Sequence, residues 1–221
     1  MIIVHHLSHS RSQRILWLLE ELGLDYEIKC YERDPKTQLA PKALREIHPL
    51  GKFPVITDGD ITMAESGAIV EYLIQRYGGQ EMQLSAGNPE WRDYQYWMHY
   101  AEGSLMPFMI MKLIFDKLKM APMPFFVRPV TKGIADKVMK AYVGPGTKNN
   151  LAFVEQYLTT HLFFANDGLT GADFQMLFPL ETAVANGTTT AHPHITAYVE
   201  RMHQRDAYQK ALKRGGDYDY A

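Results

Sequence analysis

The feature that most constrains the fold is a change of sequence pattern near residue 80. Before it, short runs rich in β-branched residues alternate with longer runs whose apolar residues recur at helical spacing. Strands are predicted at residues 1–5, 26–31, 54–58 and 61–63, and helices at 11–22, 41–48 and 66–77. After Pro89 the strand patterns largely stop and helical patterns continue. The chain therefore divides into a mixed first third and a helical remainder.

The order of these elements predicts the topology of the first third. A helix joins the first two strands, so they should pair in parallel, whereas Asp58-Gly59-Asp60 is typical of the turn of an antiparallel hairpin. The order βαβαββα over about 80 residues is the thioredoxin-like topology. We therefore predict an α+β protein, with a thioredoxin-like domain at residues 1–79 and an all-α helical-bundle domain at residues 88–221.

Within the helical part we expect helices at residues 91–113, 130–142, 150–165, 174–185 and 195–205. Residues 120–129 contain three prolines and should be irregular, and Gly144-Pro145-Gly146 should break a helix. Thr170 and Asp173 have the spacing of a capping box ahead of an apolar run, which indicates the start of a core helix.

Composition excludes several classes of function. The 221 residues are 46% hydrophobic and 22% charged, with a formal net charge of -2, so no electrostatic case exists for nucleic acid or an anionic membrane as partner. The single cysteine, Cys30, excludes an internal disulfide, a Cys-x-x-Cys redox pair and a zinc site built on several cysteines, and no metal is predicted. No signal peptide and no apolar run of about 18 residues is present, so we expect a cytoplasmic protein.

Residues 48–54, His-Pro-Leu-Gly-Lys-Phe-Pro, enter a predicted strand. Pro54 follows an aromatic residue at the strand start, which is a plausible position for a cis peptide bond. Such a bond would turn the backbone N–H and C=O of Phe53 outward, where they could pair with an extended peptide. Lys52 could then bind the carboxylate of that peptide. The segment is also compatible with an ordinary surface turn.

Two further segments place polar groups at predicted helix starts. Glu65 and Ser66 lie where a strand meets a helix, an arrangement that suits the carboxylate and ammonium of an α-amino acid, although Ser66 could simply cap the helix. Ser8, His9, Ser10 and Ser12 lie between the first strand and the first helix, where a hydroxyl could donate to a thiolate or merely cap. No Gly-x-Ser-x-Gly motif or nearby acid indicates a serine hydrolase.

Together these motifs resemble the glutathione transferase family over essentially the whole chain. The similar segments are residues 10–23, the sequence His-Pro-Leu-Gly-Lys-Phe-Pro, Glu65-Ser66 with the helix that follows, and Leu-Thr-Gly-Ala-Asp ending at Asp173. The resemblance implies a transferase, often a detoxifying one, that uses glutathione as co-substrate. It implies that Lys52, Phe53, Pro54, Glu65 and Ser66 bind glutathione, and that a first-loop hydroxyl stabilises its sulfur.

Ser10 is the predicted catalytic hydroxyl because it lies beside the helix start, with Ser8, His9 and Ser12 as alternatives. A hydrophobic electrophile would lie against apolar side chains that include Tyr100, Met106, Phe108 and Phe115. The resemblance also implies a homodimer. The alternatives are a glutathione-dependent peroxidase, disulfide reductase or isomerase on the same fold, or a non-catalytic binding protein.

Overall fold

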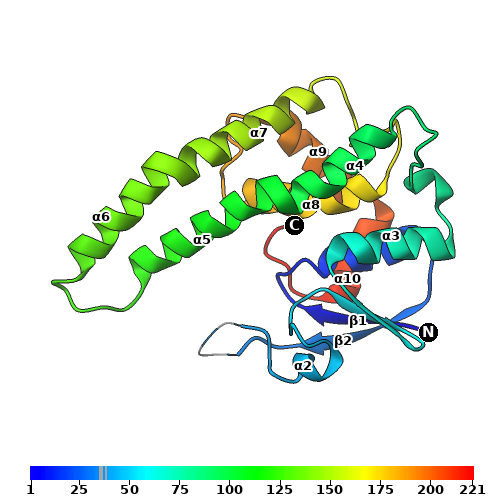
Figure 1. Ribbon diagram of the computed structural model, residues 1–221, viewed down its shortest axis with the longest axis horizontal. Coiled ribbons are helices and arrows are strands. Elements are labelled where there is room, and N and C mark those ends of the chain that lie inside the picture. Colours follow the sequence, from blue (N-terminus) through cyan, green and yellow to red (C-terminus); the bar gives the residue numbers. More distant parts are fainter. Residues whose placement is uncertain (35–36, 38) are drawn as a thin grey trace.

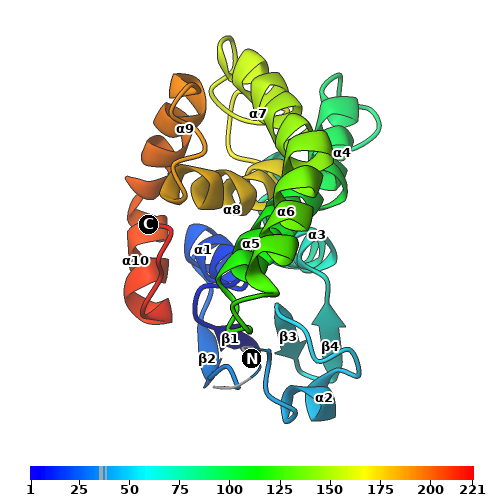
Figure 2. The same ribbon diagram turned by 90° about the vertical axis from the view of Figure 1, so that its left-hand side faces the viewer.

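The first third of the molecule is organised by a four-stranded sheet with strand order β2-β1-β3-β4 (Figure 2). The computed structural model describes residues 1–34, 37 and 39–221. The strands are β1 (Ile2–Leu7), β2 (Tyr26–Tyr31), β3 (Val55–Asp58) and β4 (Ile61–Ala64). β1 is parallel to β2 and antiparallel to β3, and β3 and β4 form an antiparallel hairpin. This confirms the predicted thioredoxin-like topology.

Helices cover both faces of the sheet. Helices α1 (Gln13–Glu21) and α3 (Ser66–Tyr77) lie on the face toward the helical part, and the short α2 (Leu44–Ile47) lies on the other face (Figure 2). α1 is buried from Gln13 to Leu19 because it packs against α3, α8 and α10 as well as against β1. It ends as predicted at Gly23, whose φ is 63°, and the Leu24 N–H donates to the Leu19 carbonyl at 3.0 Å.

α2 is shorter than the helix predicted at residues 41–48. Only Leu44–Ile47 is helical, and Pro41 to Ala43 form a turn in front of it. His48 is extended, with φ -143° and ψ 131°, as expected for a residue that precedes a proline.

The rest of the described chain is built from helices joined by loops, and the central helix is α8. They are the 3-10 turn η1 (Gln80–Met82), α4 (Trp91–Tyr100), α5 (Met106–Met120), α6 (Arg128–Val138), α7 (Gly144–Leu158), α8 (Gly171–Ala185), α9 (Pro193–His203) and α10 (Asp206–Gly215). α8 is buried from Gly171 to Glu181 and packs against α1, α3, α4 and α9. Its predicted capping box is confirmed, since the Thr170 N–H donates to Asp173 Oδ2 at 2.8 Å.

The sequence did not predict helix α10. None of the described helices is long and apolar enough to cross a membrane.

Two π-helical turns correct the predicted helix boundaries. Turn η2 (Ala101–Leu105) joins α4 to α5, and turn η3 (Met139–Val143) joins α6 to α7. Each turn closes with an N–H that reaches five residues back, from Met106 to Ala101 and from Gly144 to Met139, and each is followed by a proline in the first turn of the next helix. A proline has no N–H to donate, and the wider turn accommodates it without ending the helix.

The prediction that Gly144-Pro145-Gly146 breaks a helix is therefore wrong. Helical backbone runs without interruption from Arg128 to Leu158, and likewise from Trp91 to Met120, past the predicted end at residue 113. The two long helical segments lie side by side as a hairpin that projects beyond the sheet (Figure 1). Only residues 121–127 between them are irregular, so the predicted irregular segment is shorter than expected.

Candidate active site

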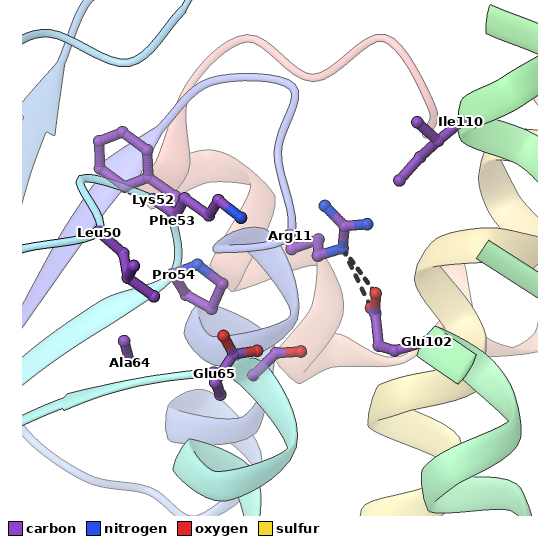
Figure 3. A pocket seen from close by; sticks show the side chains of 10 residues that line it. Arg11, Leu50, Lys52, Phe53, Pro54, Ala64, Glu65, Glu102 and Ile110 are labelled. Atoms are coloured by element: carbon purple, nitrogen blue, oxygen red, sulfur yellow. Dashed lines mark hydrogen bonds and ion pairs between the residues drawn. The ribbon is translucent and has the colours of Figure 1, made fainter. Parts of the chain in front are cut away.

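A cavity of about 380 Å³ opens between the sheet and the helical part (Figure 3). Its lining consists of Arg11, Leu50, Lys52, Phe53, Pro54, Ala64, Glu65, Ser66, Glu102 and Ile110. Arg11, Leu50, Lys52, Phe53 and Ile110 also line a wider cavity of about 1200 Å³, so the two are continuous. All the residues predicted to bind glutathione therefore lie around one cavity.

The Phe53–Pro54 peptide bond is cis, as predicted. Phe53 precedes β3, and no backbone or side-chain group in the described part of the chain hydrogen-bonds its N–H or C=O. Lys52, next to it in the cavity wall, has no carboxylate partner among the described residues. This wall therefore offers one backbone donor, one backbone acceptor and one cation to a ligand.

The start of α3 forms the second side of the cavity. Glu65 precedes the helix with φ 71°, a left-handed conformation that costs a residue with a side chain about 1–3 kcal/mol. Its carbonyl accepts the first helical hydrogen bond from the Ile69 N–H at 3.0 Å. Ser66 is buried, and its hydroxyl donates to Gln175 Oε1 at 3.1 Å and accepts from Arg14 Nη1 at 3.1 Å. The unpaired N–H groups of the first helical turn are what this side offers to an anion.

The first loop places its four candidate groups differently. His9 and Ser10 line the wider cavity, whereas Ser12 is buried and neither Ser8 nor Ser12 is part of the lining. The Ser10 hydroxyl donates to the Leu7 carbonyl at 2.7 Å and lies 2.8 Å from the Ser12 hydroxyl. His9 has a φ of 55°, and its Nδ1 accepts from the Asp219 N–H at 3.0 Å.

Ser12 is held behind the loop by His6. The Ser12 hydroxyl lies 2.8 Å from Nδ1 of His6. Burial lowers the pKa of His6 to about 4, and the Gly215 backbone accepts a hydrogen bond from the ring. The ring is therefore neutral near pH 7, with Nδ1 as the acceptor of the Ser12 proton.

Arg11 and Glu102 are site residues that the sequence analysis missed. Nε of Arg11 donates to Oε1 and Oε2 of Glu102 at 3.1 and 3.0 Å, and Nη1 of Arg14 donates to Glu102 Oε1 at 2.9 Å (Figure 3). Burial alone would raise the pKa of Glu102, but the charges and hydrogen bonds of Arg14 and Arg11 lower it. Glu102 lies in η2, and no periodicity in the sequence predicts where a residue of a π-helical turn will point.

Arg14 joins the two parts of the molecule beneath the cavity floor. Its side chain is 1% exposed and donates through Nη1 to Ser66 and Glu102, and also to Gln175 on α8. Its Nε and Nη2, like Nε2 of Gln175, have no partner among the described residues. Burial lowers the pKa of Arg14, although Glu102 opposes this shift.

The structure separates the four residues predicted to contact the electrophile. Met106 lines the wider cavity, whereas Tyr100, Phe108 and Phe115 are absent from its lining among the described residues. The Tyr100 hydroxyl donates to Asn150 Oδ1 at 2.5 Å, and the Phe108 ring packs beside Tyr142 with centroids 5.5 Å apart. The apolar lining on this side comes from Met106, Met109, Ile110 and Leu113 of α5 and Phe178 of α8.

Comparison with known proteins places this geometry in a family. A model of the glutathione S-transferase N-terminal domain matches residues 1–75, and one of the glutathione S-transferase C-terminal domain matches residues 105–206. Glutathione S-transferase 1 of Saccharomyces cerevisiae is 34% identical over 97% of this chain and 95% of its own length. Glutathione S-transferase 3 of Schizosaccharomyces pombe is 38% identical over 83% of this chain and 74% of its own length.

The fold agrees with these sequence matches. A crystal structure of a glutathione S-transferase from Actinobacillus pleuropneumoniae superposes with a TM-score of 0.80 at 33% identity, covering 100% of this chain and 95% of that one. A sphingomonad glutathione S-transferase solved with glutathione has a TM-score of 0.74 at 21% identity, which supports the fold alone. Two domain matches in the expected order, full-length relatives and a shared fold lead to one conclusion: the chain belongs to the glutathione S-transferase family.

Proposed function

We propose that this protein is a glutathione transferase that binds glutathione in the smaller cavity and conjugates its sulfur to a hydrophobic electrophile in the wider one. The observation that carries the proposal is the convergence of Lys52, Phe53, Pro54, Glu65 and Ser66 on one cavity of about 380 Å³. Cavities of a few hundred Å³ are the size that small-molecule ligands occupy.

Each anchor has a partner in the tripeptide. The backbone N–H and C=O of Phe53 pair with the cysteinyl residue, next to cis-Pro54. Lys52 binds the glycyl carboxylate. Glu65 accepts hydrogen bonds from the γ-glutamyl ammonium, and the N–H groups at the start of α3, beginning with Ser66, bind the neighbouring carboxylate. The cysteinyl sulfur then lies between the two charged ends and next to the first loop.

The reaction is a nucleophilic substitution or addition by the glutathione thiolate. The sulfur forms a bond to the electrophilic carbon, and in a substitution the leaving group departs with its bonding electrons. Ser10 is the first-loop hydroxyl that we place beside the sulfur, because it lines the wider cavity. Met106 and its apolar neighbours on α5 hold the electrophile.

The test is turnover of 1-chloro-2,4-dinitrobenzene with glutathione. Lys52→Met and Glu65→Gln should each raise the KM for glutathione roughly 10- to 100-fold, because each removes a charged hydrogen bond worth roughly 1.5–3 kcal/mol. Lys132→Met and Glu200→Gln, on exposed positions of α6 and α9, are matched controls and should leave KM unchanged. A protein that neither binds glutathione nor turns over the substrate would overturn the proposal.

We also propose the domain limits, assembly and location of the enzyme. The glutathione-binding domain comprises residues 1–79 and the helical domain residues 88–221. The enzyme is a C2 homodimer, the commonest oligomer, with α3 and α4 as candidate interface helices. It works in the cytoplasm, where thiols are kept reduced. Sedimentation as a monomer at micromolar concentration would remove the dimer from this proposal.

A further inference from the structure

We infer that Arg11 is a catalytic residue whose guanidinium contacts the glutathione sulfur and stabilises it as a thiolate. This inference rests on the proposed function and goes beyond it. It assigns the main stabilisation of the thiolate to the positive charge of an arginine and not to a hydroxyl. Arg11 lines both cavities, so it lies where the glutathione cavity meets the electrophile cavity. The sulfur of bound glutathione must lie at that junction to reach the electrophile.

The hydroxyls of the first loop have their protons engaged. Ser10 donates to the Leu7 carbonyl at 2.7 Å, and the Ser12 proton goes to the neutral ring of His6. Ser12 is also fully buried, and Ser8 is absent from the described lining of either cavity. A thiolate beside this loop would accept a hydrogen bond from a hydroxyl only if Ser10 first broke its hydrogen bond to the Leu7 carbonyl.

Arg11, by contrast, is held with its free donors toward the cavity. Glu102 holds its Nε from one side, and the guanidinium lies over the Phe178 ring, 5.6 Å from the ring centroid. Its two terminal nitrogens have no hydrogen-bond partner among the described residues. In the view of Figure 3 they point away from Glu102, into the space between Lys52 and Ile110.

Arg11 belongs to a charge cluster that has one more cation than carboxylates. Arg11 and Arg14 share one carboxylate, that of Glu102, so the cluster of three carries a net charge of +1. Lys52 and Glu65, the other charged residues of the smaller cavity, would be matched by the charged ends of glutathione. In the wider cavity Lys112 pairs with Asp116 at 2.7 Å. Lys42, Arg45 and Lys117 also line that cavity with no carboxylate partner among the described residues, but none of them lines the smaller cavity.

An unmatched cation next to a thiol favours its ionised form. An opposite charge within about 4–6 Å lowers a pKa by about 1–3 units. The side chain of Arg11 is 27% exposed, so screening by solvent is incomplete. Because turnover follows the thiolate fraction below the thiol pKa, a rise of one unit lowers the rate about tenfold at a pH under that pKa.

The experiment measures the pKa of enzyme-bound glutathione from the ultraviolet absorbance of its thiolate. The variants are Arg11→Gln, Arg11→Lys and Ser10→Ala, with Arg92→Gln as a control that removes one positive charge from the exposed surface of α4. Arg11→Gln should raise the thiol pKa by about 1–3 units and move the pH–rate profile by the same amount. Arg11→Lys should keep most of the shift, Ser10→Ala should raise the thiol pKa by less than Arg11→Gln does, and Arg92→Gln should leave it unchanged.

Two results would overturn the inference: an unchanged thiol pKa in folded Arg11→Gln, or a rise of more than about one unit in Ser10→Ala. Should Arg11→Gln fail to fold, the Ser10→Ala and Arg11→Lys values decide between the two groups. Failure of the proposed function is distinguishable, because the wild-type enzyme would then show no bound thiolate at all.

Discussion

The two walls of the cleft are built from different kinds of group. The wall next to the sheet offers mainly backbone groups, at Phe53 before the cis peptide bond and at the first turn of α3. The opposite wall offers side chains, among them Met106 and Ile110 of α5 and Phe178 of α8. Backbone groups are placed by local conformation, whereas side chains are placed by the register of a helix against its neighbours.

Because of this difference, the two walls are suited to different kinds of ligand. Backbone donors and acceptors suit an invariant peptide, and each is fixed by a short sequence motif around Pro54 or Glu65. An apolar wall of methionine, isoleucine and phenylalanine suits shapes that differ from one electrophile to another. Arg14 connects the walls, because it hydrogen-bonds Ser66 on one side and Glu102 and Gln175 on the other.

The largest expected effect is that of removing this connection. Arg14→Met should lower the free energy of unfolding by about 3–5 kcal/mol, because it leaves Glu102 with one cation fewer, removes the donor to buried Ser66 and removes one of the two donors to Gln175. Urea unfolding of the purified protein measures it.

Arg11→Met is the matched control for stability. It removes the second arginine of the same carboxylate, but from a side chain that is 27% exposed against 1% for Arg14. Its cost should stay within about 1 kcal/mol. Equal losses of unfolding free energy in Arg14→Met and Arg11→Met would mean that the two walls are not joined through Arg14.

The sequence predicted the sheet wall well and the helical wall poorly, for physical reasons. The cis bond before Pro54, the helix start at Ser66 and the hairpin turn at Gly59 each depend on a few neighbouring residues. Glu102 and Phe108, by contrast, lie in and directly after the π-helical turn at 101–105, which shifts the helix register. Periodicity of 3.6 residues assumes that no such turn intervenes, so Phe108 was placed in the cavity when it packs against α7.

Arg11 was missed for another reason. The loop that contains Arg11 stands out in the sequence for its hydroxyls, and the partner that orients Arg11 lies 91 residues further along the chain. Contacts over such a separation leave no signal in a single sequence. The same holds for His6, which is joined to Gly215 at the end of α10.

The buried ring of His6 should make a pH-dependent contribution to the free energy of unfolding. Its pKa falls from 6.5 to about 4 on burial, so the folded state binds its proton later than the unfolded state as the pH drops. The stability that its neutral form contributes is fully present above pH 6.5 and is lost between pH 6.5 and about 4. The loss amounts to about 3 kcal/mol at most.

His6→Asn removes this titration. The gap in unfolding free energy between wild type and His6→Asn, measured by urea unfolding, should narrow by about 3 kcal/mol between pH 7.5 and pH 4. Asp173, whose pKa is raised by burial to about 6, acts in the opposite direction but cancels, since both proteins contain it. Parallel curves for wild type and His6→Asn would show that His6 is not held neutral.

The smallest effect, and the one that tests the helical wall, comes from a pair of glycines. A Cβ added at Gly146 would clash with the ring of Phe108, so Gly146→Ala should force α5 and α7 apart and cost about 1–3 kcal/mol. At Gly133, inside α6, a Cβ meets nothing within 4 Å, so Gly133→Ala should stabilise by about 0.5–1 kcal/mol through helix propensity alone. Thermal unfolding of both variants measures the contrast. Because the clash is with one ring, adding Phe108→Leu to Gly146→Ala should recover part of the loss, and a double variant whose losses simply add would mean that Phe108 does not set the spacing of α5 and α7.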